Sequence, residues 1–433
     1  MFKTIEECTN FIFNLKAVDH KREPLVTMRE ILAQVGNPHE KIKTIHLAGS
    51  NGKGSTLNVL REMLERAGYR VGAFTSPHLE RVNERMTING VQISNEQFLR
   101  YANVIASVIK EHHNGDFPSF FEVVTLISFM YFAEEQVDVA LMETGLGGRF
   151  DSTNVITPLL SIITTISLEH TAILGDTYAK IASEKAGIIK AGVPVIVGVK
   201  NKEALHVIRE QAKKHNAPCS IVGEGFNATN IKQSASTQVF DYLKGKQTFE
   251  GVGLAMAGAH QVANASLAIT AALLLREEGS LFISDEVLHH ALATAQWAGR
   301  FERLSHRIVL DGAHNSEGTQ ALIATLQAVY PNSRYHFVYA ALADKDHANS
   351  ITLMDEVAAS MAFTQIELPN AMPAEKLAAL SKHSKKAWSK DWRGVIEAEW
   401  QQKEVDDILV ITGSLYFIAE ARKVLHEWME MNK

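Results

Sequence analysis

Cysteine is scarce in this chain. Only Cys8 and Cys219 occur among 433 residues, and their spacing fits neither a disulfide framework nor a metal-binding motif. We therefore expect two free thiols in a reducing compartment. No stretch approaches the length of a transmembrane helix, and the N-terminal sequence Met-Phe-Lys-Thr-Ile-Glu-Glu has acids and no long apolar region of a signal peptide. The sequence predicts a cytoplasmic protein.

An excess of positive charge is also absent. The chain has 43 Lys and Arg against 49 Asp and Glu, a formal net charge of −6, which argues against a general nucleic-acid or membrane-surface binder. Any anionic ligand must be held by local cations and backbone amides. Apolar residues make up 46% and charged residues 21%, as in an ordinary globular protein, and the length allows two or three domains.

Strand-like and helical stretches alternate along the first half of the chain. This alternation predicts βαβ units, and hence an α/β fold with a mainly parallel sheet covered on both faces. After a strand that enters the loop at 49–55, the expected strands are 70–75, 137–143, 159–164 and 193–199. The expected helices are 4–16, 24–35, 53–67, 119–135, 177–189 and 202–215.

The pattern changes after residue 226. Segments 237–242 and 248–254 suggest a small antiparallel element, followed by helices at 260–278 and 285–295. We place a domain boundary near Trp297, which gives an N-terminal domain 1–298 and a smaller C-terminal, Rossmann-like α/β domain 299–433. Its expected strands are 307–311, 335–340, 361–366 and 407–412, with helices at 316–329, 350–359 and 414–430. Segment 369–390 receives no assignment.

The strongest chemical signal lies in segment 44–56, Thr-Ile-His-Leu-Ala-Gly-Ser-Asn-Gly-Lys-Gly-Ser-Thr. A short apolar run leads into a glycine-rich turn and a helix that starts near Lys53. Backbone N–H groups of such a turn cradle phosphate oxygens at a helix N-terminus. Lys53 would reach the β- and γ-phosphates, and Ser55 or Thr56 can offer a hydroxyl to Mg²⁺. The strict P-loop pattern fails twice, because Leu47 replaces its first glycine and Gly54 replaces its Ser or Thr. A tight turn without a ligand is the alternative.

Three strand ends carry groups suited to a metal. Glu143 ends an apolar strand and precedes a glycine-rich turn, which is where Mg²⁺ is commonly bound beside a phosphate loop. His170 and Ser76 follow two other strands. Each has an ordinary alternative: a solvated acid, a histidine bonded to backbone, or a Ser-Pro turn.

Lys185 lies on a predicted helix in the sequence Ala182-Ser-Glu-Lys-Ala-Gly-Ile188. A helical lysine is usually a surface charge. The small residues Ala186 and Gly187 instead indicate that this face packs closely, which would desolvate the Lys185 amine and lower its pKa.

Together these pieces resemble the folylpolyglutamate synthase and dihydrofolate synthase family, the folate branch of the ATP-dependent Mur ligases. The resemblance covers about residues 40 to 420 and preserves the order of the motifs. The matching motifs are Gly49-Ser-Asn-Gly-Lys-Gly-Ser55, Ser76-Pro-His-Leu79, Glu143-Thr-Gly-Leu-Gly-Gly-Arg-Phe-Asp151, Glu169-His-Thr171, Glu184-Lys-Ala-Gly187, Gly258-Ala-His-Gln261 with Asn264, Gly299-Arg-Phe301, Asp311-Gly-Ala-His-Asn315 and Gly413-Ser-Leu-Tyr416.

The resemblance implies a P-loop ATPase domain, a Rossmann-like ligase domain and catalysis between them. It assigns ATP contacts to Asn51, Gly52, Lys53, Gly54, Ser55, Asn264, Arg300 and Asp311. It assigns Mg²⁺ ligation to Ser76, Glu143 and His170, and catalysis to Lys53, Glu143, His170 and Lys185, with Lys185 carried as a carboxylated lysine. It places the pterin near Ser119, Phe120, Phe121, Phe150, Asp151 and Ser152. The aromatic faces of the phenylalanines among them suit stacking on a flat heterocycle. His314 and Ser414 are the expected contacts to glutamate.

The implied function is an ATP-dependent amide ligase that adds L-glutamate to folates, and to dihydropteroate as a second acceptor, through an acyl phosphate with release of ADP and phosphate. The implied cofactors are Mg²⁺ and ATP, with a monovalent cation as a further candidate. We expect a monomer without nucleic-acid or membrane partners. The alternatives are a P-loop phosphotransferase or NTPase, a monofunctional folylpolyglutamate synthase, and a sensor without catalysis. A cell-wall Mur ligase is the nearest relative, but an extra N-terminal substrate domain is not expected before residue 49.

Three departures from the family pattern touch backbone stiffness or pterin contacts. Ala298 and Ser316 stand where proline is common, and segment 21–26, Lys-Arg-Glu-Pro-Leu-Val, lacks the usual Gly-Leu. Ala298 and Ser316 remove no chemical group from the expected site, whereas the change in segment 21–26 affects the expected local contacts to the pterin.

Overall fold

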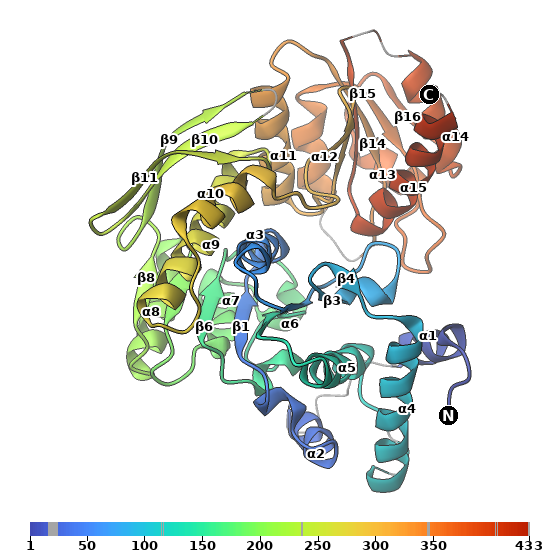
Figure 1. Cartoon of the computed structure of the whole chain (residues 1–433). Coiled ribbons are helices and arrows are strands. Elements are labelled where there is room, and N and C mark those ends of the chain that lie inside the picture. Colours follow the sequence, from blue (N-terminus) through green and yellow to red (C-terminus); the bar gives the residue numbers. More distant parts are fainter. Residues whose placement is uncertain are drawn as a thin grey trace. The chain divides into compact units, whose positions relative to one another are not determined.

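The computed structural model describes residues 1–15, 25–113, 115, 117–234, 237–343, 347–402, 404 and 406–431 (Figure 1). They form two compact units. Unit 1 comprises 1–229, 242–250 and 263–293, and unit 2 comprises 230–241, 251–262 and 294–433. Residues 21–24 of the segment that departs from the family pattern lie outside the described residues. The boundary expected at 298/299 stays a prediction.

Unit 1 is built on a sheet with the strand order β4-β3-β2-β5-β1-β6-β7-β8. From β2 to β8 neighbouring strands are parallel, while β3 and β4 add an antiparallel hairpin at one edge. The fold class predicted from alternation is confirmed. The strands are β1 (Thr44–Ala48), β2 (Val71–Phe74), β3 (Met86–Ile88), β4 (Val91–Gln92), β5 (Val139–Glu143), β6 (Leu160–Ile163), β7 (Val195–Val197) and β8 (Cys219–Ile221).

Helices cover both faces of this sheet. α3 (Lys53–Arg66) packs on β1, β2 and β5. The other face carries two apolar clusters, one built around α5 (Phe120–Glu134) and one around α7 (Tyr178–Lys185). The remaining helices that contribute to these two clusters are α1 (Ile5–Phe13), α2 (Val26–Gln34), α4 (Asn95–His112) and α8 (Lys202–Lys214).

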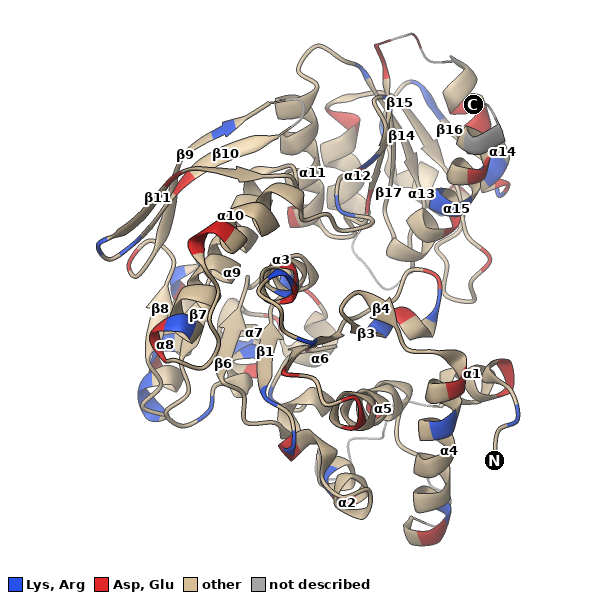
Figure 2. Cartoon of the chain, viewed as in Figure 1, with Lys and Arg blue, Asp and Glu red and all other residues tan. Residues whose placement is uncertain are grey.

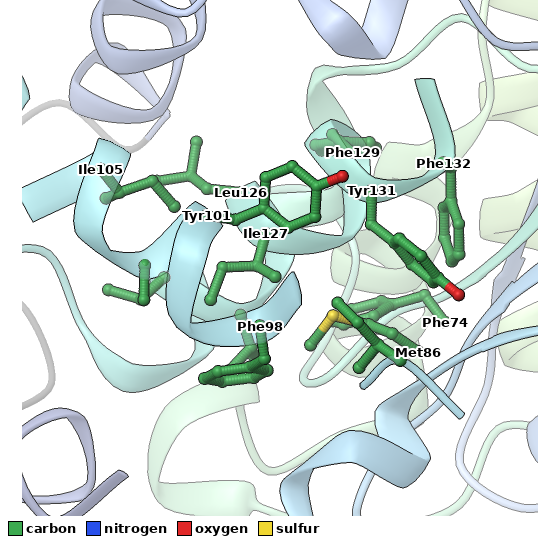
Figure 3. Close-up of a cluster of buried hydrophobic side chains, with 14 of the residues drawn as sticks. Phe74, Met86, Phe98, Tyr101, Ile105, Leu126, Ile127, Phe129, Tyr131 and Phe132 are labelled. Carbon is green, nitrogen blue, oxygen red and sulfur yellow. The ribbon is translucent and has the colours of Figure 1, made fainter. Parts of the chain in front are cut away.

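α5 is apolar around most of its circumference and is correspondingly buried. Figure 3 shows its side chains in one cluster with Phe98 and Tyr101 of α4, where the Tyr131 ring lies 6.4 Å from Tyr101 and 5.6 Å from Phe132 between centroids. Such aromatic side chains contribute much of the apolar area that a core removes from water. Phe74, Ala140 and Met142 contribute to the cluster from the strands, so it joins α4 and α5 to this face of the sheet.

Unit 2 contains a second sheet with the order β12-β13-β17-β14-β15-β16, parallel except for β12. Helices α11, α12 and α13 lie against one face, and α14 and α15 contact the other. The elements are β12 (Glu302–Ser305), β13 (Ile308–Asp311), α11 (Ser316–Val329), β14 (Tyr335–Tyr339), α12 (His347–Asp355), β15 (Ala358–Phe363), α13 (Ala374–Leu380), β16 (Lys386–Trp388), α14 (Trp392–Gln402), β17 (Ile408–Thr412) and α15 (Leu415–Met431).

A separate three-stranded sheet has the order β11-β10-β9, and two helices follow it in the chain. The expected antiparallel element is therefore larger than the two strands assigned from sequence. The elements are β9 (Asn227–Gln233), β10 (Gln238–Lys244), β11 (Gln247–Leu254), α9 (Ala259–Glu277) and α10 (Asp285–Thr294).

Candidate active site

The phosphate loop, residues 49–55, joins the carboxyl end of β1 to α3. Gly52 precedes the helix at φ 88°, and a Cβ there would lie 2.2 Å from Asn264 Oδ1, so only glycine fits. The N–H groups of Ser50 and Asn51 donate to the carbonyl and the Oγ1 of Thr165, each at 2.9 Å. The loop shape is thus set by α9 and by the chain that follows β6, and the expected proximity of Asn264 to the loop is observed.

Lys53 and Glu143 meet beside this loop. Lys53 Nζ donates to Gly49 O at 2.9 Å and lies 3.9 Å from Glu143 Oε1. Glu143 is 3% exposed, and its Oε2 accepts the Ser76 N–H at 3.1 Å. Three residues expected to serve the phosphates and the metal are therefore brought together at one edge of the sheet, where parallel strands present their carboxyl ends.

Lys185 approaches the same carbonyl from α7. Its side chain is buried, and Nζ donates to Gly49 O and to Glu169 Oε1, each at 3.0 Å. Burial lowers the pKa of Lys185 to about 8, although the Glu169 carboxylate opposes this shift. For Glu169, burial would raise the pKa, but Lys185 and Lys53 outweigh it and bring the pKa to about 2. The expected desolvation of Lys185 is present.

Glu169 was not assigned a role from sequence, although it is half of the Glu-His pair after β6. The structure makes it the counter-charge of Lys185. His170 follows it with φ 46° and begins the short helix α6 (Thr171–Leu174), so the backbone brings it to the same edge. A buried lysine needs an acid nearby, and that requirement was the signal in the sequence.

Aromatic side chains line the neighbouring part of unit 1. The Phe120 ring stacks on Phe13 at 4.8 Å between centroids, and the Arg85 guanidinium lies 5.1 Å from its centre. Phe121 packs under the loop after β5, where a Cβ on Gly145 would lie 2.6 Å from its ring. The sequence predicts Phe120 and Phe121 near the pterin. The contacts of Phe13 and Arg85 with Phe120 join residues distant in the chain, which no helix pattern marks.

The remaining residues expected at the pterin either make hydrogen bonds to other residues of the protein or are exposed to solvent. Ser119 caps α5, and Ser152 Oγ lies 3.2 Å from Thr125 Oγ1. Asp151 is buried, and its two oxygens accept hydrogen bonds from Gly145, Leu146 and Thr153. Phe150 is exposed, with the Arg149 guanidinium 5.9 Å from its ring centre. Their contacts to a substrate stay predictions.

In unit 2 the expected residues gather at the carboxyl ends of β13 and β17. Asp311 accepts the N–H groups of Phe301 at 2.7 Å and Ala313 at 2.8 Å, and burial raises its pKa while the Arg300 guanidinium opposes that shift. His314 Nδ1 donates to Gly312 O at 2.8 Å. Because Asp311 pairs with Thr412 in register, His314 and Ser414 emerge at adjacent strand ends.

The group around Glu143 fits Mg²⁺ bound together with a nucleotide. Mg²⁺ is commonly held by one or two carboxylates, with phosphate and water oxygens completing its octahedron. Within the described ranges no three His, Cys, Asp or Glu side chains are placed to hold a metal alone, and the expected set of Ser76, Glu143 and His170 contains only two such residues. Basic and acidic side chains are interspersed along the elements of each unit (Figure 2). In the part of the chain that the structure describes, no helix is long and apolar enough to cross a membrane.

Comparison with known proteins matches both parts of the chain. Residues 47–272 match the family model of the Mur ligase middle domain, and residues 299–415 match the model described as Mur ligase, glutamate ligase domain. A Bacillus subtilis protein named dihydrofolate synthase/folylpolyglutamate synthase is 41% identical over 403 residues, which is 92% of this chain and 94% of that protein.

Solved structures agree with this similarity. A folylpolyglutamate synthase from Thermotoga maritima superposes with a TM-score of 0.83 at 33% identity, over 98% of this chain and 96% of that one. Escherichia coli FolC in complex with DHPP and ADP gives a TM-score of 0.88 at 26% identity, over 99% of both chains. Sequence, fold and the residues around the phosphate loop lead to the same conclusion: the chain belongs to the folylpolyglutamate synthase/dihydrofolate synthase family of Mur ligases and is an ATP-dependent ligase.

Proposed function

We propose that this ligase joins the α-amine of L-glutamate to a carboxylate of a folate, with dihydropteroate as a second acceptor. The observation that carries the proposal is the meeting of Lys53, Glu143 and the Lys185–Glu169 pair around the Gly49 carbonyl, with contacts of 2.9 to 3.9 Å. Cations and a carboxylate at a phosphate loop suit transfer of a phosphoryl group to a carboxylate.

The chemistry needs activation, because a carboxylate and an amine do not form an amide in water unaided. The acceptor carboxylate attacks the γ-phosphorus in line, ADP leaves, and an acyl phosphate forms. The glutamate amine then attacks the acyl carbon, loses a proton, and phosphate departs. In the first step two anions approach each other, so Lys53 lowers the barrier by placing positive charge beside the phosphate oxygens.

Glu143, Ser76 and His170 would hold Mg²⁺, which would supply positive charge to offset that of the phosphates. Glu143 is directed toward this position by the Ser76 N–H. Asn51, Gly52, Gly54 and Ser55 would bind the phosphates through the loop. Asn264, Arg300 and Asp311 are the proposed further nucleotide contacts, and His314 and Ser414 are the proposed contacts to glutamate.

Lys185 is proposed to act as a carbamate. With a pKa of about 8, about a tenth of the amine is neutral at pH 7. That neutral nitrogen adds to CO₂, a C–N bond forms and a proton leaves, so a positive charge becomes a negative one. A bare lysine beside a Mg²⁺ site would repel the metal, but Glu169 supplies the counter-charge of the Lys185 ammonium. Carboxylation would place two anions side by side, so a bound cation is required for it to persist.

A coupled assay tests the proposed function. Purified protein receives ATP, Mg²⁺ and L-glutamate with tetrahydrofolate in one arm and dihydropteroate in another. ADP release that requires both glutamate and an acceptor identifies the ligase, and activity in both arms identifies a bifunctional enzyme. ADP release without any acceptor would instead identify an NTPase, and activity only with tetrahydrofolate a monofunctional synthase.

A further inference from the structure

A chain of buried polar groups lies beneath the loop that follows Glu143. His46 of β1 is fully buried, and its Nε2 lies 2.8 Å from Thr153 Oγ1. The Thr153 hydroxyl donates to Asp151 Oδ1. Asp151 Oδ2 accepts the N–H groups of Gly145 at 2.8 Å and Leu146 at 2.9 Å. The proposed reaction uses neither His46 nor Thr153.

The hydrogen bonds fix the direction of this chain. Burial raises the pKa of Asp151, and the hydrogen bonds from Thr153, Leu146 and Gly145 oppose that shift. Because its two oxygens accept four donors, Asp151 is best satisfied as a carboxylate, and the Thr153 hydroxyl proton points to it. His46 Nε2 must then carry the proton that reaches Thr153 Oγ1. The imidazole is neutral, since burial, aided by the Lys190 ammonium, lowers the pKa of His46 to about 3. His46 therefore donates to Thr153, and Thr153 donates to Asp151.

Residues 149–154 are also hydrogen-bonded to the residues on either side of Lys185. Asn154 Nδ2 donates to Arg149 O and to Gly187 O, each at 3.0 Å. The Arg149 N–H donates to Glu184 O at 2.7 Å. The loop after Glu143 and the end of α7 are therefore joined through residues 149–154.

Packing alone does not account for a histidine at this place. His46 lies on β1, between β5 and β6, opposite Met142 and Ser161, where an apolar side chain would fill the space without burying polar atoms. Its Nδ1 is buried and has no hydrogen-bond partner in the described structure, which is destabilising. The hydrogen bond that offsets this cost is the one that Nε2 makes with Thr153 Oγ1.

We propose that His46 and Thr153 are positioning residues of the ligase: through Asp151 they hold the Gly145 and Leu146 amides, and so keep the Glu143 loop in place relative to Lys185. The inference rests on the proposed function and extends it to two residues that touch no substrate. It also gives Asp151 a structural task in addition to its expected place near the pterin.

Matched substitutions test the proposal. Thr153→Val keeps the shape and removes the hydroxyl, and His46→Leu removes the donor. Thr153→Ser restores the hydroxyl, and His46→Gln places an amide N–H near the position of Nε2. The control is Thr44→Val, a buried threonine on the same face of β1 whose Oγ1 has no partner among the described residues. Folate- and glutamate-dependent ADP release and hydrogen exchange of the Gly145 and Leu146 amides are measured for each variant.

We expect kcat to fall at least tenfold in Thr153→Val and His46→Leu, with KM for ATP within threefold of wild type. Thr153→Ser should retain kcat within threefold, His46→Gln should exceed His46→Leu, and Thr44→Val should match wild type. Hydrogen exchange of the Gly145 and Leu146 amides should accelerate at least tenfold in Thr153→Val and His46→Leu. It should stay unchanged in Thr44→Val. Wild-type kcat in Thr153→Val, or a lower kcat without faster exchange, would overturn the proposal.

The two hypotheses fail separately. If the wild-type protein shows no acceptor-dependent ADP release, the proposed function fails, and the exchange of Gly145 and Leu146 still decides whether His46 and Thr153 hold the loop. If Thr153→Val does not fold, the comparison of His46→Gln with His46→Asn replaces it, because the shorter amide cannot reach Thr153. Equal kcat and equal exchange in those two variants would overturn the positioning role.

Discussion

Two ammonium groups converge on one backbone oxygen in this protein. Lys53 and Lys185 both donate to Gly49 O, and Glu143 and Glu169 offset their charge. Like charges this close repel unless acids or a ligand lie between them. We therefore expect the phosphate oxygens of a bound nucleotide to be attracted most strongly near this carbonyl, where the two lysines converge.

Lys53→Ala should lower kcat by about 10²–10³-fold, the usual range for loss of one group that stabilises developing charge. The fold should persist, because the Lys53 amine contacts Gly49 and Glu143 and lies outside the apolar clusters. Steady-state ADP release and thermal unfolding are the measurements. Lys180→Ala, which removes an exposed lysine of α7 paired with Asp176, is the control, and wild-type turnover in Lys53→Ala would refute the phosphate assignment.

Glu143→Gln keeps the shape of the side chain and removes its charge. The Mg²⁺ concentration for half-maximal activity should rise by about tenfold or more, since a neutral amide is a poorer ligand than a carboxylate. A Mg²⁺ titration at saturating ATP measures it. Superimposable titrations of variant and wild type would show that Glu143 does not ligate the metal.

Lys185→Ala should be nearly inactive, and short carboxylic acids in the buffer should restore part of the activity by replacing the carbamate. Lys180→Ala is again the control, because its ammonium is exposed. Mass spectrometry of native protein equilibrated with bicarbonate should show one added CO₂. An unmodified Lys185 in a fully active enzyme would exclude the carbamate.

At the scale of elements, α4 illustrates how local hydrogen bonds define a helix. Ser94 Oγ accepts the Gln97 N–H at 3.1 Å, and Gln97 Oε1 accepts the Ser94 N–H at 3.4 Å, which forms a capping box. The capped end satisfies two N–H groups that would otherwise lack partners.

Ser94→Ala should therefore destabilise unit 1 by about 1 kcal/mol and leave kcat unchanged. The matched control is Ser107→Ala on the same helix, whose hydroxyl bonds back to Asn103 O at 3.1 Å and supports no cap. Urea unfolding followed by far-ultraviolet circular dichroism compares them. Equal stability of the two variants would contradict the capping argument.

The sequence pattern identified the elements that are long or strongly apolar. β1, β5, β6 and α3 appear where alternation and the glycine-rich turn placed them. α4 was missed, although the Ser94–Gln97 spacing is a readable helix start. The hairpin β3–β4 and the edge strand β12 have two to four residues each, too few for a period, and only pairing with a neighbour makes them strands.

Two C-terminal assignments, the helix at 350–359 and the strand at 361–366, were wrong in extent. The helix expected at 350–359 covers His347–Asp355, and Ala358 already belongs to β15, because the short side chains of Ala358 and Ala359 suit either state and sheet pairing decides. The unassigned segment 369–390 contains α13 and β16. Lys53, Glu143 and Lys185 could be named from sequence because the proposed chemistry needs a cation or a carboxylate there, and their roles stay predictions. The contacts of Glu169, Phe13 and Arg85 join residues that lie apart in the sequence, so no local pattern marks them.

At the scale of the whole molecule, pH should act on stability through unit 2. His336 Nε2 lies 3.0 Å from Asp407 Oδ2, and its Nδ1 lies 2.8 Å from Ser360 Oγ, which donates to Glu399. The Glu399 carboxylate, 3.7 Å from Nδ1, raises the pKa of His336 above 6.5, with a further contribution from Asp407. Because the pKa of His336 is higher in the folded than in the unfolded protein, its protonation stabilises the fold. This contribution is complete below about pH 6.5 and is lost as the pH rises through the folded-state pKa.

The free energy of unfolding of wild type should therefore exceed that of His336→Gln most at pH 5.5 to 6.5, and the difference should shrink toward pH 8.5. The lowered pKa of Asp407 affects only more acidic solutions. Urea unfolding at several pH values measures the difference. His112→Gln, on exposed α4 surface, is the control, and a difference that grows with pH would contradict the assignment.

The division into two units has an optical consequence. All five tryptophans of the chain, Trp297, Trp388, Trp392, Trp400 and Trp428, belong to unit 2, and the residues of unit 1 include none. Tryptophan emission therefore reports the unfolding of unit 2 alone, whereas far-ultraviolet dichroism reports both units. A mutation in the phosphate loop that melts unit 1 can leave the fluorescence trace of unit 2 intact, so the two signals together separate the two stabilities in one sample.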